Sequence, residues 1–152
     1  MNETVYFSAM RDVYYDHSSY VGDVIKFNQI FANFGNGFDG QNGIFTAPKS
    51  GLYQFHFSAQ SSDQFPGDRT IIEVNLNDQA QLQILDGGRK SKIDFNNISY
   101  TWTFHLKLND KLTLQMYKGD DFLYVSPLFK IYFIGHLIVA DWSINALLEV
   151  PE

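Results

Sequence analysis

Residues 45–59, FTAPKSGLYQFHFSA, decide the fold, because a turn containing Pro and Gly is followed by a run of strictly alternating side chains. Apolar residues fall at every second position, and polar residues fill the positions between them. The apolar positions are Tyr53, Phe55, Phe57 and Ala59. Since successive side chains of a strand point to opposite faces, this pattern predicts a half-buried β-strand.

The same two-residue period recurs in residues 70–77, 101–108 and 111–118. Turn sequences rich in Gly, Asn and Asp separate these runs, and no run has the period of an amphipathic helix. We therefore expect about ten short strands in a sandwich or barrel. Residues 130–140, KIYFIGHLIVA, are apolar on both faces, so we expect the core on one face and either a partner subunit or a long loop on the other.

Length and composition narrow the possible classes of protein. The 152 residues suit a single domain, 1–152, with its core at about 5–140 and a peripheral C-terminal tail at 141–152. An aromatic content of 16% favours β-structure, and a net charge of −6 argues against binding to nucleic acid. Without cysteine there is no disulfide framework. The longest apolar run is too short for a membrane span, and no secretion signal is visible, which fits either a cytosolic chain or a mature fragment.

A search for catalytic motifs gives no nucleophile, base or metal centre, so the sequence predicts a protein that is not an enzyme. The letters GNGFDG at 35–40 match a dinucleotide-binding motif, but Gly43 and Pro48 follow where that motif needs a helix, so we interpret them as a turn. His56 and His105 fall on the polar sides of predicted strands, where exposure or hydrogen bonding is expected more often than metal binding.

Residues 25–59 strongly resemble the globular head of the complement C1q family. The residues that carry the resemblance are Asn33, Gly35, Phe38, Gly43, Phe45, Pro48, Gly51, Tyr53 and Phe55. Further matches at Phe7-Ser8-Ala9, LKLNDKLTLQM (106–116) and FIGHLIV (133–139) extend it from about Val5 to Ala140. The sequence departs from the family pattern at three positions, with Asn109 for Gly, Ile134 for Ser and His136 for Phe. Asn tolerates a positive φ, so the first change is expected to keep its turn, whereas the others alter packing in the last strand.

The resemblance implies an all-β protein, a ten-stranded jelly-roll β-sandwich that assembles as a homotrimer. It also implies a secreted, non-enzymatic recognition module, innate-immune or lectin-like, that binds a protein, a glycan or a microbial surface. Two alternatives remain open from the residues. One is a structural trimerisation head of a collagen-like or coiled-coil extracellular protein, and the other is a cytokine-like receptor ligand.

The resemblance further implies a calcium site near the threefold axis, at Asp86 and Asp94. The alternative is that Asp86 opens a turn and the basic groups of the same loop neutralise both acids without a metal. Exposed loops at 61–69, 86–97 and 118–128 are the expected ligand surface. Their candidate binding residues are Arg89, Lys90, Lys92, Tyr117, Phe122 and Tyr124. The aromatic members have an alternative role as filling for the core or the subunit interface. If the chain is secreted, the sequons at Asn2 and Asn97 are candidate glycosylation sites.

Overall fold

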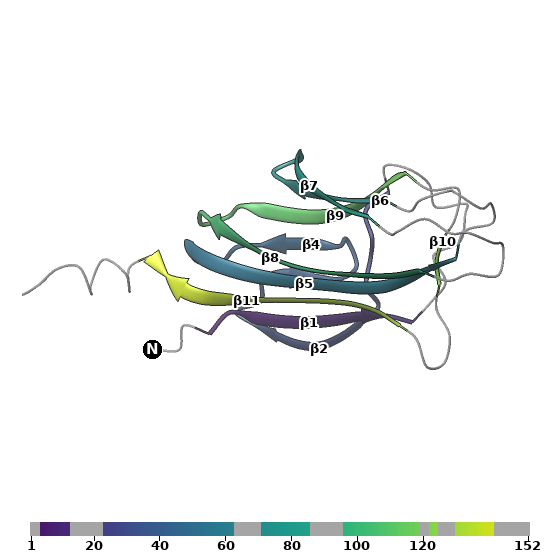
Figure 1. Cartoon of the computed structure of the whole chain (residues 1–152). Helices are drawn as coiled ribbons and strands as arrows, with labels where there is room; N and C mark the ends of the chain where they lie inside the picture. The colour runs from purple at the N-terminus through teal and green to yellow at the C-terminus, as the bar shows by residue number, and fades with distance from the viewer. Residues whose placement is uncertain are drawn as a thin grey trace, which may run out of the picture.

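The computed structural model describes residues 4–12, 23–62, 71–85, 96–118, 122–124 and 130–141, and within them the chain forms eleven β-strands (Figure 1). The strands are β1 (Tyr6–Arg11), β2 (Gln29–Phe34), β3 (Phe38–Asp39), β4 (Ile44–Thr46), β5 (Gly51–Ser62), β6 (Ile71–Leu76), β7 (Gln79–Leu85), β8 (Asn96–Leu106), β9 (Lys111–Lys118), β10 (Phe122–Tyr124) and β11 (Ile131–Ala140). No helix in these ranges has the length and apolar character needed to cross a membrane.

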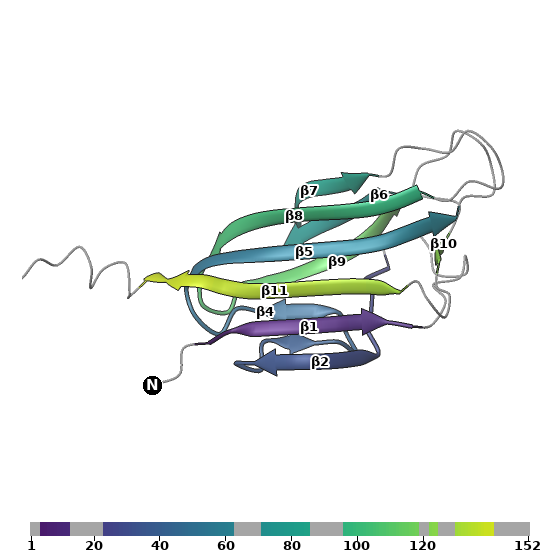
Figure 2. The same ribbon diagram turned by 60° about the horizontal axis from the view of Figure 1, so that its bottom comes forward.

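The strands form two antiparallel sheets that pack face to face (Figure 1). The six-stranded sheet runs in the order β8-β5-β11-β1-β2, and the short strand β10 pairs with the far end of β5 (Figure 2). The five-stranded sheet runs in the order β3-β4-β9-β6-β7. Six of the nine strand pairings join strands that are not consecutive in the chain, as in a jelly roll, whereas β1-β2, β3-β4 and β6-β7 are consecutive. The predicted all-β sandwich is confirmed. The structure has one strand more than the ten predicted, because β3 and β10 are counted as strands although they have only two and three residues.

The core between the sheets is built mainly from aromatic rings. Phe7 stacks on Phe38 with ring centroids 4.4 Å apart and meets Phe133 edge-on at 5.0 Å. The four apolar residues predicted to share one side of β5 are all buried, with at most 2% of their surface exposed. The five-stranded sheet contributes aliphatic side chains from β6 and β9, including Ile72 and Leu114. Burial of this apolar surface is the main stabilising contribution to the fold.

Gly135 allows β11 to pack against the rings of its neighbouring strands. A Cβ atom at this position would lie 2.4 Å from Cε1 of Phe7 and 2.8 Å from Cδ1 of Phe55. These separations are well inside van der Waals contact, so a larger residue would push the strand away from the aromatic core. The glycine of FIGHLIV is therefore required by packing rather than by a turn.

The motif residues that precede β5 lie on β2, β3 and β4 and in the turns that follow them. Asn33 clamps the first of these turns, since its Nδ2 donates to the carbonyl of Phe38 at 2.8 Å and its Oδ1 accepts from the backbone N–H of Phe38 at 3.1 Å. Gly35 lies in the left-handed region with φ +89°, which favours glycine. Further along, the Tyr53 hydroxyl donates to the carbonyl of Lys49 at 2.7 Å. No helix follows GNGFDG, so the prediction of a turn is confirmed at residues 35–37 and 40, but Phe38 and Asp39 between them form the short strand β3.

The connection from β8 to β9 shows that the predicted end of the strand at residues 101–108 was wrong. The alternation had placed Leu108 on the apolar side of its strand, but β8 ends at Leu106 and Leu108 is 56% exposed. The chain turns here through Asn109, whose φ is +73°. The expectation that Asn109 keeps the turn in place of glycine is confirmed, and this early turn is the reason why Leu108 leaves the core.

Candidate binding surface

Most of the sequence-predicted site residues fall outside the described residues: Asp86, Asp94, Arg89, Lys90, Lys92 and Asn2. Tyr117 lies at the exposed end of β9, in the five-stranded sheet. Phe122 and Tyr124 are described by their backbone, which forms the ends of β10 in the six-stranded sheet. The three aromatic residues therefore belong to two different sheets. The calcium site and the loop binding residues remain predictions.

Asn97 lies within β8, where the sequence had predicted a loop. Its side chain is exposed on the side of the sheet away from the core, and its Oδ1 is 3.4 Å from Nε2 of Gln60 on β5. A glycan at Asn97 would therefore project from the strand across this outward side. Glycosylation of Asn97 remains a prediction.

The six strands of the larger sheet contain Arg11 as their single Asp, Glu, Lys or Arg residue. Arg11 stands at the end of β1, at a position that alternates with the outward-pointing Met10. The side of this sheet that faces away from the core, seen in Figure 2, consequently carries none of these four residue types at its described strand positions. We refer to this side as the uncharged face. In a chain with 17 acidic and 11 basic residues, such a surface is unusual.

The uncharged face has an apolar half and a polar half. The apolar half lies over β2, β1 and β11 and includes Phe34, Tyr6, Tyr132 and Ile134; Phe34 is 56% exposed and Tyr132 is 37% exposed. Pairing brings these residues together, because Tyr6 stands opposite Phe34, and Ile134 stands opposite the backbone of β1 at Ser8. The polar half lies over β8 and consists of outward-pointing Asn, Ser, Thr and His side chains.

Sequence reasoning found only a part of this surface. It identified β11 as apolar on both sides, and the structure confirms this with Ile131 and Phe133 buried and Tyr132 and Ile134 pointing outward. It missed the contribution of β1 and β2. The available signal was the lack of charge in each of these separate segments, but only the pairing of distant strands shows that the segments share one face.

The three histidines among the described residues lie on the uncharged face. His56 on β5 is half-buried, and its Nδ1 is 2.7 Å from Oγ1 of Thr101 on β8. His136 on β11 is also half-buried and stands between Tyr6 and Gln54 of the adjacent strands. At the end of the face, Nε2 of His105 lies 2.7 Å from Oδ1 of Asp141. The prediction that His56 and His105 occupy the polar sides of their strands is confirmed.

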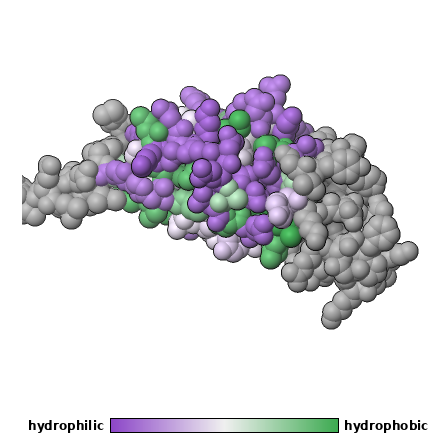
Figure 3. All heavy atoms as spheres, turned by 90° about the horizontal axis from the view of Figure 1, so that it is seen from above, coloured by the Kyte–Doolittle hydropathy of each residue, from purple (hydrophilic) through white to green (hydrophobic). Residues whose placement is uncertain are grey.

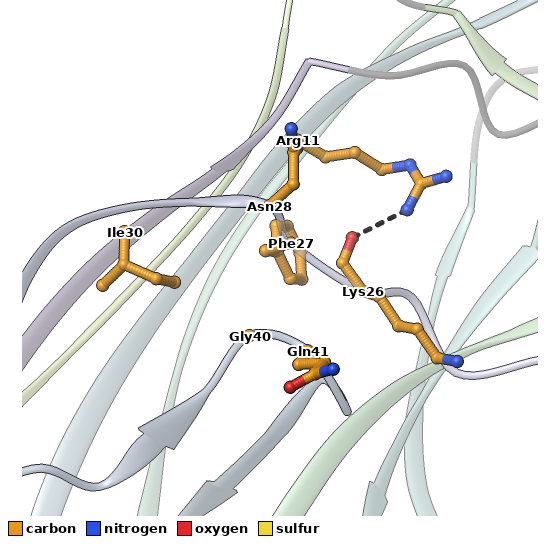
Figure 4. A pocket seen from close by; sticks show the side chains of 7 residues that line it. All are labelled: Arg11, Lys26, Phe27, Asn28, Ile30, Gly40 and Gln41. Carbon is orange, nitrogen blue, oxygen red and sulfur yellow. Dashed lines mark hydrogen bonds between the residues drawn. The ribbon is translucent and has the colours of Figure 1, made fainter.

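A pocket of about 420 Å³ opens at the edge of the sandwich near β2 (Figure 4). Its lining residues are Arg11, Lys26, Phe27, Asn28, Ile30, Gly40 and Gln41. The Nη1 atom of Arg11 donates to the Lys26 carbonyl at 3.0 Å, and Nδ2 of Asn28 donates to the Asp12 carboxylate beside it. All polar side chains of the lining are at least partly exposed, and one carboxylate, that of Asp12, accompanies the two cations beside the pocket. The pocket therefore provides no concentrated charge with which to select a ligand.

The described residues contain no group of three or more His, Asp or Glu side chains arranged to hold a metal ion. Among the described ionisable groups, those with a shifted pKa make hydrogen bonds that hold local structure. Asp39 illustrates this, since its carboxylate accepts from the side chain and backbone of Asn42, which lowers its pKa while it holds a surface turn.

The class that the fold defines is an all-β jelly-roll β-sandwich, here with an aromatic core and a broad uncharged face. A family model for the C1q domain matches residues 6–138, and the chain belongs to the C1q domain family. Among solved structures, the globular domain of the zebrafish complement 1qA protein is similar with a TM-score of 0.72 and 21% identity, over 90% of this chain and 99% of that chain.

Two further structures share the fold at lower identity. Eiger TNF from S. frugiperda matches with a TM-score of 0.64 and 16% identity, over 92% of this chain and 95% of that chain. Murine APRIL, in crystals at pH 8.0, matches with a TM-score of 0.62 and 16% identity, over 89% of this chain and 100% of that chain. At these identities the matches establish the jelly-roll architecture.

Proposed function

We propose that this protein is a secreted, non-enzymatic homotrimer that recognises a protein, glycan or microbial surface, with the uncharged face as its subunit interface. The observation that carries the proposal is the lack of Asp, Glu, Lys and Arg on that face. Depletion of charge in the central part of a surface, together with enrichment in aromatic residues, is the compositional mark of protein interfaces.

Physical chemistry favours burial of this face. Exposed aromatic and aliphatic side chains such as Phe34, Tyr132 and Ile138 leave apolar area in contact with water, and assembly removes it. No strand on this face would need to bury an ionised Asp, Glu, Lys or Arg, so assembly avoids the large cost of desolvating such charges. Closed symmetry then limits the assembly to a defined number of copies.

With this face occupied by other subunits, recognition is assigned to the remaining surface. The proposed ligand surface is formed by the loops at 61–69, 86–97 and 118–128, which include Arg89, Lys90 and Lys92. Support comes from membership of the C1q domain family, and secretion is proposed on the same basis. We also keep the calcium site at Asp86 and Asp94 as part of the proposal, because paired carboxylates brought together by symmetry need a hard cation or basic groups to offset their repulsion.

Sedimentation equilibrium of the purified chain tests the assembly. A mass of three chains at micromolar concentration is the expected result, and a monomer throughout the concentration range would refute the proposed interface. Thermal unfolding with calcium and with a chelator tests the metal site in the same sample. An unfolding temperature that is unchanged by both additions would remove calcium from the proposal, since a ligand that binds the folded state raises its stability.

A binding panel of glycans and bacterial surfaces tests recognition. Saturable binding that is weakened when Arg89, Lys90 and Lys92 are replaced together by Ser is the expected result. A trimer that binds no member of the panel would instead favour the structural trimerisation head or the receptor ligand. These two alternatives are separated by assaying cell-surface binding of the same trimer.

A further inference from the structure

We propose that His136 and His56 make assembly through the uncharged face sensitive to pH, so that the trimer weakens as the pH falls below neutrality. This inference rests on the proposed function, because it assigns a form of regulation to the same interface. The reasoning starts from the fact that histidine is the only side chain that ordinarily changes its charge between pH 5 and 8.

His136 occupies a central position in the sheet. β11 lies between β1 and β5, and the residues opposite His136 on these strands are Tyr6 and Gln54. On β11 itself, the outward-pointing residue before His136 is Ile134. The side chain of His136 is already half-buried in the single chain. None of these neighbours carries a carboxylate that would stabilise an imidazolium. Contact with two further copies of this face would remove water from the ring as well.

His56 is the diagonal neighbour of His136 across β5 and β11. His136 stands opposite Gln54, and His56 is the next outward-pointing residue after Gln54 on that strand. Side chains in this diagonal relation have Cα atoms about 7–8 Å apart. The hydrogen bond of His56 is to the hydroxyl of Thr101, which is neutral. Protonation of both rings would therefore place two like charges close together without a counter-charge.

The other charged and titratable groups lie at the ends of this part of the face. Lys130 directly precedes β11, and Asp141 directly follows it and pairs with His105 at 2.7 Å. Protonation of His105 would strengthen that pair, which is opposite in sign to the effect at the centre of the face. Tyr6 and Tyr132 also face outward but remain neutral in the range of pH concerned. The acid-sensitive groups at the centre are thus the two histidines.

The direction of the effect follows from linkage between proton binding and assembly. If the trimer keeps these rings neutral while the separated subunit allows them to be protonated, the separated subunits bind more protons. The constant for trimer dissociation then increases by up to about tenfold per pH unit for each excluded proton. With threefold repetition, even His136 alone predicts an increase of at least about 100-fold between pH 7.5 and pH 5.5.

The test is the constant for trimer dissociation, measured by sedimentation of the full chain at pH 7.5, 6.5 and 5.5. The variants are His136→Phe, His56→Gln and their combination, with His105→Gln as the matched control. Far-ultraviolet circular dichroism at each pH separates dissociation from unfolding. We expect at least about a 100-fold change for the original chain and for His105→Gln, and less than about tenfold for the double variant.

The outcomes are distinguishable from failure of the trimer itself. A chain that is monomeric at pH 7.5 refutes the proposed assembly, whereas a trimer whose dissociation constant is unchanged down to pH 5.5 refutes only the proposed regulation. The regulation is also refuted if the double variant dissociates on acidification as strongly as the original chain. If the double variant does not fold, the single variant His136→Phe provides the test. Its increase in the constant for trimer dissociation between pH 7.5 and pH 5.5 should be at least about tenfold smaller than that of the original chain.

Discussion

The outward sides of the two sheets differ in charge, although the strands of both sheets alternate in the same way. The five-stranded sheet exposes Glu73 and Lys111 within its strands, whereas the uncharged face of the six-stranded sheet has no such residue. Figure 3 views the molecule from above, where β7, β6 and β9 lie uppermost in Figure 1, and hydrophilic residues cover most of the described surface there.

The difference teaches that burial in a single chain does not show whether the outer side of a sheet meets water or another protein. Both sheets have one apolar side that packs into the same aromatic core. A sheet whose second side meets water needs polar and charged residues there, and the five-stranded sheet has them. The six-stranded sheet has polar but no charged residues on its second side, which suits the contact with protein that we propose. The buried sides therefore maintain the fold, whereas the outward side of the six-stranded sheet would maintain the proposed assembly.

The largest effect is expected in the part that both sheets share. Replacement of Phe133 by Ala removes a fully buried ring that contacts Phe7 and Phe38, and we expect a loss of about 3–5 kcal/mol in the free energy of unfolding. Thr113→Ala, on the outward side of β9, is the matched control and should change it by about 0.5 kcal/mol or less. Denaturant unfolding measures both, and similar losses in the two variants would contradict this assignment of the core.

The next effect tests the difference between the two outward sides directly. Ile134→Glu introduces a carboxylate at the centre of the uncharged face, and we expect the constant for trimer dissociation to increase at least about 100-fold because the charge must be desolvated. Gln83→Glu places the same charge on the exposed side of β7 and should leave that constant within about threefold. Sedimentation of both variants at pH 7.5 is the measurement. Equal weakening by both would mean that the two sides do not differ in role.

Local pattern was sufficient to predict much of the fold. The period of two in residues 51–59 assigns each side chain to its face because strand geometry alone determines it, and the structure confirms that assignment. The error at Leu108 arose because periodicity does not show where a strand ends. There the turn at Asn109 takes precedence over the alternation.

The candidate surface was less predictable because it depends on pairing between distant segments. β1 and β11 are adjacent in the sheet although more than 100 residues separate them in the chain, and the contact of Tyr6 with β11 follows from that pairing. No local pattern contains this information. The metal and ligand residues came from resemblance alone, and Asp86 and Asp94 lie outside the described residues, so that part of the site remains a prediction.

A smaller effect is expected at the turn through which the chain leaves the six-stranded sheet for the five-stranded one. Asn109 has φ +73°, its N–H donates to the Ala47 carbonyl at 2.8 Å, and the turn is closed by Asp110. Asn109→Ala should cost about 1–2 kcal/mol, because a Cβ in the left-handed region is strained without the polar group of Asn. Asn109→Gly should change stability by about 0.5 kcal/mol or less, since glycine accepts this φ but is more flexible when unfolded. Equal losses in the two variants would show that backbone strain is not the cause.

The smallest effect concerns the tyrosine of the stretch that decides the fold. The Tyr53 hydroxyl donates to the Lys49 carbonyl at 2.7 Å, and we expect Tyr53→Phe to cost about 1 kcal/mol at pH 8. Tyr117→Phe, at an exposed position on β9, is the control and should cost less than about 0.5 kcal/mol.

The cost of Tyr53→Phe should itself depend on alkaline pH. Burial raises the pKa of Tyr53 to about 12 from its ordinary value of 10.0, so the folded chain holds the phenol neutral where the unfolded chain ionises it. Stability from Tyr53 is then complete below pH 10 and is lost as the pH rises toward 12. Denaturant unfolding at pH 8 and pH 11 should therefore show the original chain losing its advantage over Tyr53→Phe. A constant difference between the two chains would mean that the phenol is as exposed in the folded state as in the unfolded one.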